Sequence, residues 1–288
     1  NCVNKPFNNA KKILEADTKE LRISIIHDSA ATTGISVCIR KSPPVIRNTI
    51  SGMIKDKYCP TDILMLLINC VTAGMNFVIG GEPGSGKTEF VKFLMQFIPL
   101  EKRVITIEDS LEIHYSEINP EADAVELRVG EDFSYTDAIK ACLRQNPMWL
   151  VLSEARSVEV TSLIEQWSTG VNGITTIHLD DLRKLPDRIE NMMNDVNDAS
   201  RLENRIYRYV NVGVLIRREK EADGGIRRYI DQMCFYVREE HKNRVYMLVE
   251  DGEIISRKIP ADIAKRLKLA GIDEFFWCDL DPFIKRGM

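Results

Sequence analysis

The segment 81–88, Gly-Glu-Pro-Gly-Ser-Gly-Lys-Thr, has the residue types and spacing of a loop that binds phosphate groups. Its glycines let the backbone curl so that consecutive N–H groups point at phosphate oxygens, and the helix expected next adds its positive N-terminal end. Lys87 would neutralise the β and γ phosphates, and Thr88 would bind Mg²⁺ through its hydroxyl. The segment predicts ATP and Mg²⁺ binding by Gly81, Pro83, Gly84, Ser85, Gly86, Lys87 and Thr88. A glycine-rich turn with an exposed lysine is the alternative.

Acidic residues follow two apolar runs in which strands are expected. Glu108 and Asp109 come after residues 103–107, and Glu154 comes shortly after residues 150–152. Because the carboxyl ends of parallel strands meet at one edge of a sheet, these acids could converge on the phosphate loop. There, Glu154 would hold Mg²⁺ through water and orient or deprotonate the attacking water, and Glu108 would assist. The alternative is that both are solvated turn residues.

A histidine ends the segment 168–178, in which a glycine-containing turn leads into a β-branched run. His178 could sense the γ-phosphate or carry that information across a subunit contact. A purely structural histidine is the alternative.

The elements that must position these residues follow from hydrophobic patterning. Strands are expected at 75–79, 103–107 and 149–152, and helices at 89–95, 135–143 and 158–167. A further helix starts near Thr61, capped by Thr61 or Asp62, and ends at Ala73-Gly74. This alternation predicts a mostly parallel sheet flanked by helices.

Additional elements are expected on both sides of this central part. Upstream, residues 21–26 and 35–40 alternate in character as strands of a small sheet, and Ser42-Pro43-Pro44 marks a linker. Downstream, a helix is expected at 185–193, and strands at 210–216, 228–238 and 244–250 with turns at 223–225 and 239–243.

Composition limits the class of protein. The 288 residues are 44% hydrophobic and 28% charged, as in globular proteins with a substantial core, and the length favours about two domains. A net charge of -4 disfavours direct nucleic-acid binding. Seven cysteines without a CxxC pair indicate neither a disulfide framework nor a zinc site, which favours the cytoplasm. No apolar stretch reaches the ~20 residues of a membrane span, so partners would hold the protein at a membrane.

Taken in order, these motifs resemble those of the secretion and pilus ATPases, the superfamily of the CpaF, PilT and GspE types and the type IV secretion traffic ATPases. The phosphate loop matches fully, and residues 106–113 resemble the family's aspartate box. Residues 143–156, with Leu143-Arg144, Pro147 and the acid Glu154, resemble its Walker B region. Residues 169–178 resemble its histidine box. The resemblance covers roughly residues 20–215 and is closest to the compact CpaF-like type.

The resemblance implies an α/β fold, with a RecA-like P-loop NTPase domain and a small N-terminal α+β domain. Residues 1–45 would be a partial N-terminal sensory domain with its linker, and residues 46–288 the ATPase domain with a β-rich and helical extension from about 201. Six copies would form a ring that hydrolyses ATP and powers pilus assembly, secretion or conjugation. The ring would be cytoplasmic and held at the inner membrane by a platform protein. Arg40, Arg128 and Arg144 occupy positions where relatives place arginines near the nucleotide.

Several residues depart from the family pattern. Val171 replaces the first histidine of the histidine box, Ser153 replaces the glycine before Glu154, and Asn146 and Met148 flank Pro147 in place of arginine and aspartate. The long N-terminal region and tetracysteine motif of many GspE-type members are absent.

Three other functions stay open at this point. They are a nucleotide-regulated scaffold with weak hydrolysis, a P-loop small-molecule kinase, and a DNA translocase. The translocase would use the arginines at 201, 205, 208, 217, 218, 227 and 228. The cargo and the direction of the motor are open as well.

Overall fold

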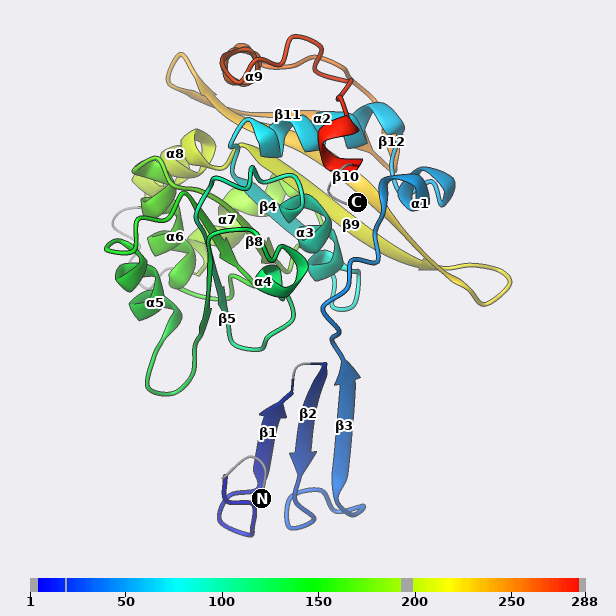
Figure 1. The fold of residues 1–288 in the computed structure, drawn as a ribbon, viewed down its shortest axis with the longest axis vertical. Coiled ribbons are helices and arrows are strands. Elements are labelled where there is room, and N and C mark those ends of the chain that lie inside the picture. The colour runs from blue at the N-terminus through cyan, green and yellow to red at the C-terminus, as the bar shows by residue number, and fades with distance from the viewer. Residues whose placement is uncertain (1–4, 19, 193–198, 285–288) are drawn as a thin grey trace.

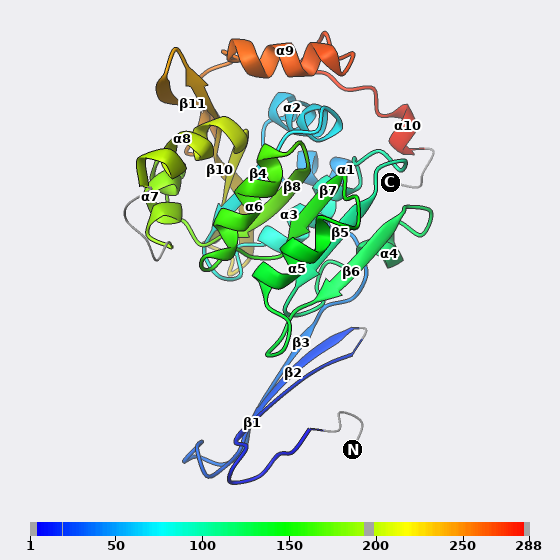
Figure 2. The ribbon, with the colours of Figure 1, turned by 90° about the vertical axis from the view of Figure 1, so that its left-hand side faces the viewer.

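The computed structural model describes residues 5–18, 20–192 and 199–284. It contains a three-stranded sheet near the N-terminus and a nine-stranded sheet in the main body. Figures 1 and 2 show the small sheet standing beyond one end of the main body, to which one connecting segment joins it. Over these described ranges, no helix combines the length and the apolar character needed to cross a membrane.

The small sheet is antiparallel, in the order β1-β2-β3. Its strands are β1 (Ile13–Asp17), β2 (Leu21–Ile26) and β3 (Ser36–Lys41). The two strands expected here are confirmed, and β1 is an addition. Within 5–18 and 20–45 the chain forms strands and turns only, so these residues supply the β part of the expected α+β domain. The domain boundary near residue 45 stays a prediction.

Strand register divides the small sheet into two chemically different faces. Ile23 pairs with Ile39 and Ile25 with Val37, which places these side chains on one apolar face. Arg22 pairs with Arg40 on the opposite face. The polar face carries the side chains that turn toward the main body.

The main sheet has the order β12-β11-β10-β9-β4-β8-β7-β5-β6. The six strands from β9 to β6 are parallel, and β10, β11 and β12 extend the sheet in antiparallel pairs. The strands are β4 (Phe77–Gly81), β5 (Val104–Glu108), β6 (Ala124–Arg128), β7 (Trp149–Leu152), β8 (Asn172–Ile177), β9 (Val212–Lys220), β10 (Ile226–Glu239), β11 (Lys242–Glu250) and β12 (Glu253–Ile254). The expected parallel sheet and C-terminal strands are confirmed.

Helices cover both faces of the main sheet. Figure 1 shows α5, α6, α7 and α8 on one side and α2 and α3 on the other. Helix α9 packs into the same core as α2 and α3. The helices are α1 (Ile50–Lys55), α2 (Thr61–Thr72), α3 (Lys87–Met95), α4 (Tyr115–Ile118), α5 (Tyr135–Cys142), α6 (Glu159–Ser168), α7 (Leu185–Glu190), α8 (Ala199–Tyr209), α9 (Ala261–Leu269) and α10 (Asp281–Ile284), with a short 3₁₀ turn η1 (Leu182–Lys184).

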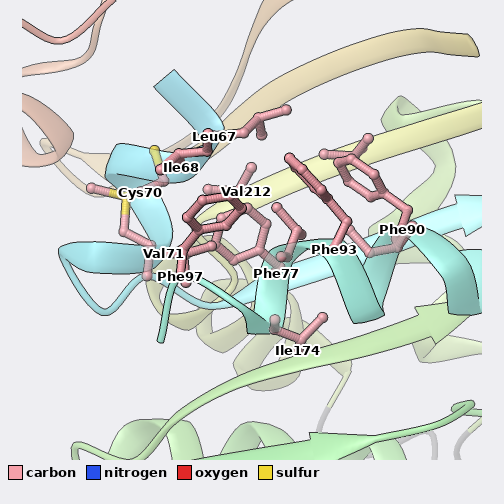
Figure 3. Close-up of a cluster of buried hydrophobic side chains, with 14 of the residues drawn as sticks. Leu67, Ile68, Cys70, Val71, Phe77, Phe90, Phe93, Phe97, Ile174 and Val212 are labelled. Carbon is pink, nitrogen blue, oxygen red and sulfur yellow. The ribbon is translucent and has the colours of Figure 1, made fainter. Parts of the chain in front are cut away.

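Strand β4 lies between the two resulting cores. Phe77 and Ile79 pack into the core under α2 and α3, and Val78 packs into the core under α5 and α6. Figure 3 shows Phe77 beside Phe93 and Phe97, with α2 closing the cluster. Because both faces of β4 are buried, its carboxyl end holds the phosphate loop in a fixed place.

Helix ends differ in detail from the expectations. Helix α2 begins at Thr61 with Pro60 as its N-cap and no capping side chain, so the proposed caps Thr61 and Asp62 are wrong. Its end at Ala73 is confirmed, and Gly74 takes a left-handed φ of 68°. Helix α7 ends at Glu190, and the predicted end at Met193 lies outside the described residues.

Candidate functional site

The phosphate loop connects the end of β4 to the start of α3, as the sequence predicts. Gly84 and Gly86 have φ values of 74° and 99°, which L side chains rarely adopt. At Gly81 a Cβ would lie 2.6 Å from the Ile216 carbonyl oxygen and from Ser85 Oγ. The loop therefore needs glycine at all three positions, for conformation and for space.

Lys87 folds back over this loop. Its Nζ donates to the carbonyl oxygens of Gly81 at 2.8 Å and Glu82 at 3.0 Å. Burial lowers the pKa of the Lys87 ammonium from 10.5 to about 8. A phosphate anion beside Nζ would reverse this effect, so the site is arranged to gain from one.

His178 joins Lys87 to Glu154. Its Nδ1 lies 3.2 Å from Lys87 Nζ, and its Nε2 lies 2.8 Å from Glu154 Oε1. His178 Nδ1 also lies 3.2 Å from the Gly81 carbonyl oxygen, so the ring bridges the phosphate loop and Glu154. The predicted convergence of Lys87, His178 and Glu154 is therefore present in the geometry.

Arg156 fixes the other oxygen of Glu154. Its guanidinium binds Glu154 Oε2 at 2.7 Å and Asp109 Oδ2 at 2.7 Å. The bond to Glu154 is the main reason why the pKa of Arg156 is raised, so its charge is permanent. Sequence reasoning gave Arg156 no role, although its position two residues after Glu154 was a signal.

Glu112 is the acid nearest to the loop hydroxyl. Thr88 Oγ1 donates to Glu112 Oε2 at 3.3 Å. From the small sheet, Arg22 Nη1 lies 3.2 Å and Arg40 Nη2 3.7 Å from Glu112 Oε1. Arg40 therefore lines the cavity beside Glu112, and its contact with the nucleotide stays a prediction. Sequence reasoning missed Glu112 and Arg22. Glu112 lies within the aspartate box, four residues after Glu108, and that was its only signal.

Glu108 lies behind Glu112 and does not line the cavity. It is fully buried, and its Oε2 accepts the backbone N–H groups of Glu112 and Ile113, each at 3.0 Å. Burial raises the pKa of the Glu108 carboxyl from 4.5 to about 8, and Oε1 has no hydrogen-bond partner. In this structure Glu108 supports the backbone of the segment that carries Glu112. Its predicted contact with water or metal stays a prediction.

The other two predicted arginines lie away from the loop. Arg128, at the end of β6, forms an ion pair with Asp17 of β1. Arg144 is exposed just after α5. Neither lines the cavity in this chain.

One cavity of about 810 Å³ lies between the phosphate loop, the acidic side chains beside it and the small sheet. Its wall includes the phosphate loop, Glu112, Glu154 and His178 from the main body, and Arg22 and Arg40 from the small sheet. Pockets of this size accommodate ligands as large as a nucleotide.

The site residues fit a nucleotide with Mg²⁺. Ser85 Oγ is buried inside the loop without a hydrogen-bond partner. Thr88 and Glu112 bring a hydroxyl and a carboxylate oxygen, the hard ligands that Mg²⁺ prefers, within 3.3 Å of each other. Among the described residues no group of three or more His, Cys, Asp or Glu side chains could hold a metal ion. Mg²⁺ would therefore take its remaining ligands from phosphate and water, as it usually does.

Departures from the family pattern fall at two places. Ser153 lines the cavity, and its Oγ lies 3.1 Å from the Tyr135 hydroxyl. Asn146, Met148 and Val171 instead line a different pocket, where β7 and β8 begin.

The sequence matches the family described as type II/IV secretion system protein over residues 11–212. An uncharacterized protein of Bacillus anthracis is 30% identical over 220 residues, which are 75% of this chain and 49% of that protein. The type IV secretion system protein VirB11 of Brucella suis is 29% identical over 184 residues, 60% of this chain and 51% of that protein. This chain thus spans about half the length of these relatives.

The fold is similar to that of solved ATPases. The X-ray structure of the Legionella pneumophila ATPase DotB superposes with a TM-score of 0.61 at 17% identity, covering 80% of this chain and 64% of that one. The RecA-like fold predicted from the sequence is confirmed.

Proposed function

Because this chain belongs to the type II/IV secretion system protein family, we propose that it is the ATP-hydrolysing part of a motor for pilus assembly, secretion or conjugation. One observation carries the proposal: Lys87, Thr88, Glu112, Glu154 and His178 converge on one cavity at the carboxyl ends of parallel strands. Such an edge is where doubly wound sheets bind nucleotides.

The side chains divide the work of hydrolysis. Mg²⁺, bound with the nucleotide through Thr88, would neutralise charge on the phosphate oxygens. Lys87 leaves the loop carbonyls and binds the β and γ phosphate oxygens. Glu154, held by its neighbours His178 and Arg156, would hold Mg²⁺ through water and would orient the attacking water. Glu112 assists beside Thr88, in the role that sequence reasoning gave to Glu108.

The small sheet couples this chemistry to movement. Arg22 and Arg40 reach Glu112 across the cavity, and both belong to the sheet that stands beyond the main body. A γ-phosphate beside Glu112 would compete for these guanidinium groups, which bind phosphate and carboxylate alike. Loss of that phosphate after hydrolysis would change how the small sheet is held, and this change is the proposed power stroke.

Family membership supports the remaining proposals. The working form is a homo-oligomer, a ring of six copies, that acts in the cytoplasm at the inner face of the cell membrane. A platform protein of the secretion or pilus system holds it there. We propose that Arg128 and Arg144, which lie outside the cavity of one chain, meet the nucleotide of a neighbouring copy.

Phosphate release by purified protein tests the enzymatic proposal. Lys87→Ala is expected to abolish nucleotide binding, whereas Glu154→Gln keeps affinity for a fluorescent ATP analogue and loses about a hundredfold or more in turnover. Glu121→Gln, at an exposed carboxylate, is the matched control. Unchanged turnover in Glu154→Gln would contradict the assignment. If the unmodified protein binds nucleotide but releases no phosphate, the result would favour the nucleotide-regulated scaffold. If the protein stays a monomer or dimer when nucleotide is bound, the result would favour the small-molecule kinase.

A further inference from the structure

The β9–β10 hairpin has two differently charged faces. Strand register pairs Arg218 with Arg228 on one face and Arg217 with Tyr229 on the other. Figure 1 shows this hairpin projecting past the end of the main sheet. The face that carries Arg218 and Arg228 is called the first face. Ile216 of β9 points to the same side and lies in the core under α2 and α3, so the first face is directed toward the phosphate loop.

Cations on the second face are compensated. Arg217 binds Asp231 at 2.6 Å, and Arg227 lies over the Tyr229 ring at 4.7 Å. The Tyr229 hydroxyl in turn donates to Glu219 at 2.5 Å, and Glu219 pairs in register with Arg227. This face therefore has local partners for both of its arginines.

Cations on the first face are not compensated. Arg218, Arg228 and Lys220 form no ion pair with a carboxylate in the part of the chain that the structure describes. Arg218 and Arg228 are directly opposite each other, and like charges in that position destabilise a strand pair. An anion beside the two guanidinium groups would remove this penalty.

The two arginines lie against the phosphate loop. Arg228 Nη2 is 3.5 Å from the Gly84 carbonyl oxygen, and Arg228 Cδ is 3.1 Å from the place where a Cβ on Gly86 would be. Arg218 Nη1 is 3.3 Å from the corresponding position on Gly84. Arg228 also lines the cavity, together with Tyr58. The loop glycines thus leave the room in which the arginines lie.

The position of the pair selects one end of a nucleotide. Lys87 contacts His178, which contacts Glu154, so the γ-phosphate end lies on that side of the loop. Arg228 contacts the loop at Gly84 and has no hydrogen bond to any of these groups within the described residues. The nucleoside end must leave the loop away from the acids.

We propose that Arg228, with Arg218 beside it, binds the nucleoside-side phosphate of the bound nucleotide. This inference rests on the proposed function, because it concerns the same cavity. Arginine suits the role, since its planar fork matches phosphate geometry and its charge does not depend on pH. This proposal gives the two hairpin arginines a specific ligand, the phosphate of a nucleotide. It differs from the DNA-translocase alternative, in which the arginines of this part of the sequence would bind nucleic acid.

Binding of Mg-ATP and of inorganic tripolyphosphate tests the inference. Arg228→Gln is expected to weaken both ligands by about tenfold, because one charge-assisted contact to phosphate is lost from each. Arg218→Gln should weaken both by a smaller factor, and Arg228→Lys should recover part of the loss. Arg227→Gln, one residue away on the compensated face, is the matched control and should stay within about twofold of the unmodified protein.

Thermal unfolding of the ligand-free variants checks the charge argument. Arg218→Gln removes the like-charge pair, so its Tm should not fall below that of Arg227→Gln. A lower Tm would overturn the argument that the pair is unbalanced without an anion.

Two binding results would also overturn the inference. Weaker ATP binding with unchanged tripolyphosphate binding would assign Arg228 to the base or ribose. Unchanged binding of both ligands would leave the pair without a role at the nucleotide. Failure of the proposed function is distinguishable, because the unmodified protein would then bind ATP no better than Lys87→Ala.

Discussion

Replacing Glu108 by glutamine should make the protein more stable at pH 8 than its parent, although it removes a carboxylate from the acidic segment 108–112. Burial raises the pKa of the Glu108 carboxyl from 4.5 to about 8, so the folded state keeps a proton that the unfolded state releases. Stability contributed by this group is therefore full below pH 4.5 and is lost as pH rises through 8. Glutamine has no such dependence.

The size of the effect follows from the two pKa values. Each unit of difference corresponds to about 1.4 kcal/mol, so the free energy of unfolding should change by roughly 3 to 4 kcal/mol between pH 5 and pH 8 relative to the glutamine variant. The amide oxygen of glutamine can still accept the N–H groups of Glu112 and Ile113. Support for the Glu112 backbone should therefore survive, and turnover should fall far less than in Glu112→Gln, which we expect to lose about a hundredfold.

Urea unfolding at pH 5, 6, 7 and 8 measures this difference directly. Glu121→Gln, which removes an exposed carboxylate, corrects for the loss of one formal charge. The reasoning is refuted if Glu108→Gln becomes less stable than the parent as pH rises. That result would mean that Glu108 is ionised and that its charge stabilises the loop through the two N–H groups.

Three further predictions concern Lys87 of the phosphate loop, two residues that depart from the family pattern, and the buried Asn76. Because the pKa of Lys87 is about 8 without ligand, ATP affinity should fall about tenfold from pH 7 to pH 9. Calorimetry in two buffers at pH 9 should show that the protein takes up a proton when ATP binds. An affinity that does not change with pH would contradict this prediction. Val171→His should leave phosphate release within about twofold and Ser153→Gly within about fivefold, and a large gain in either would show that the departure limits turnover. Asn76→Ala should lower the free energy of unfolding by about 2 to 4 kcal/mol in urea, because the side chain makes one buried and one partly buried hydrogen bond to backbone; a loss below 1 kcal/mol would contradict that role.

The phosphate loop could be predicted from the sequence because the residues that determine its conformation are neighbours in the chain. The glycine conformations, the strand before them and the helix after them all lie within residues 77–95, so one short pattern specifies the whole unit. His178 and Glu154 were predictable for a related reason, since each follows a short β run whose end must lie at the loop edge of a parallel sheet.

The second acid could not be assigned in the same way. Glu108 ends β5, and Glu112 lies four residues later in an irregular segment before α4. Strand periodicity describes the first position and says nothing of the second. Only the turn made by the chain shows that the Glu108 carboxyl is directed inward to two N–H groups, while Glu112 reaches Thr88.

Arginine roles depended even more on tertiary structure. Arg22 and Arg40 reach Glu112 only because the small sheet packs its polar face toward the main body. Arg218 and Arg228 are ten residues apart in sequence, and hairpin register alone makes them neighbours. A run of arginines in sequence therefore did not distinguish a solvated face from a ligand site.

The placement of the family departures bears on how active the site can be. His178 follows β8 and Val171 precedes it, so the six residues of the strand separate the two by about 20 Å along the sheet. Asn146 and Met148 lie at the same far edge as Val171. Among these four residues Ser153 alone lines the cavity, and within the described residues its hydroxyl contacts Tyr135 and none of Lys87, Thr88, Glu112 and Glu154. These substitutions therefore give weak hydrolysis no physical basis at the phosphate loop. Asn146, Met148 and Val171 lie instead where β7 and β8 begin, at the edge of the sheet opposite to the phosphate loop.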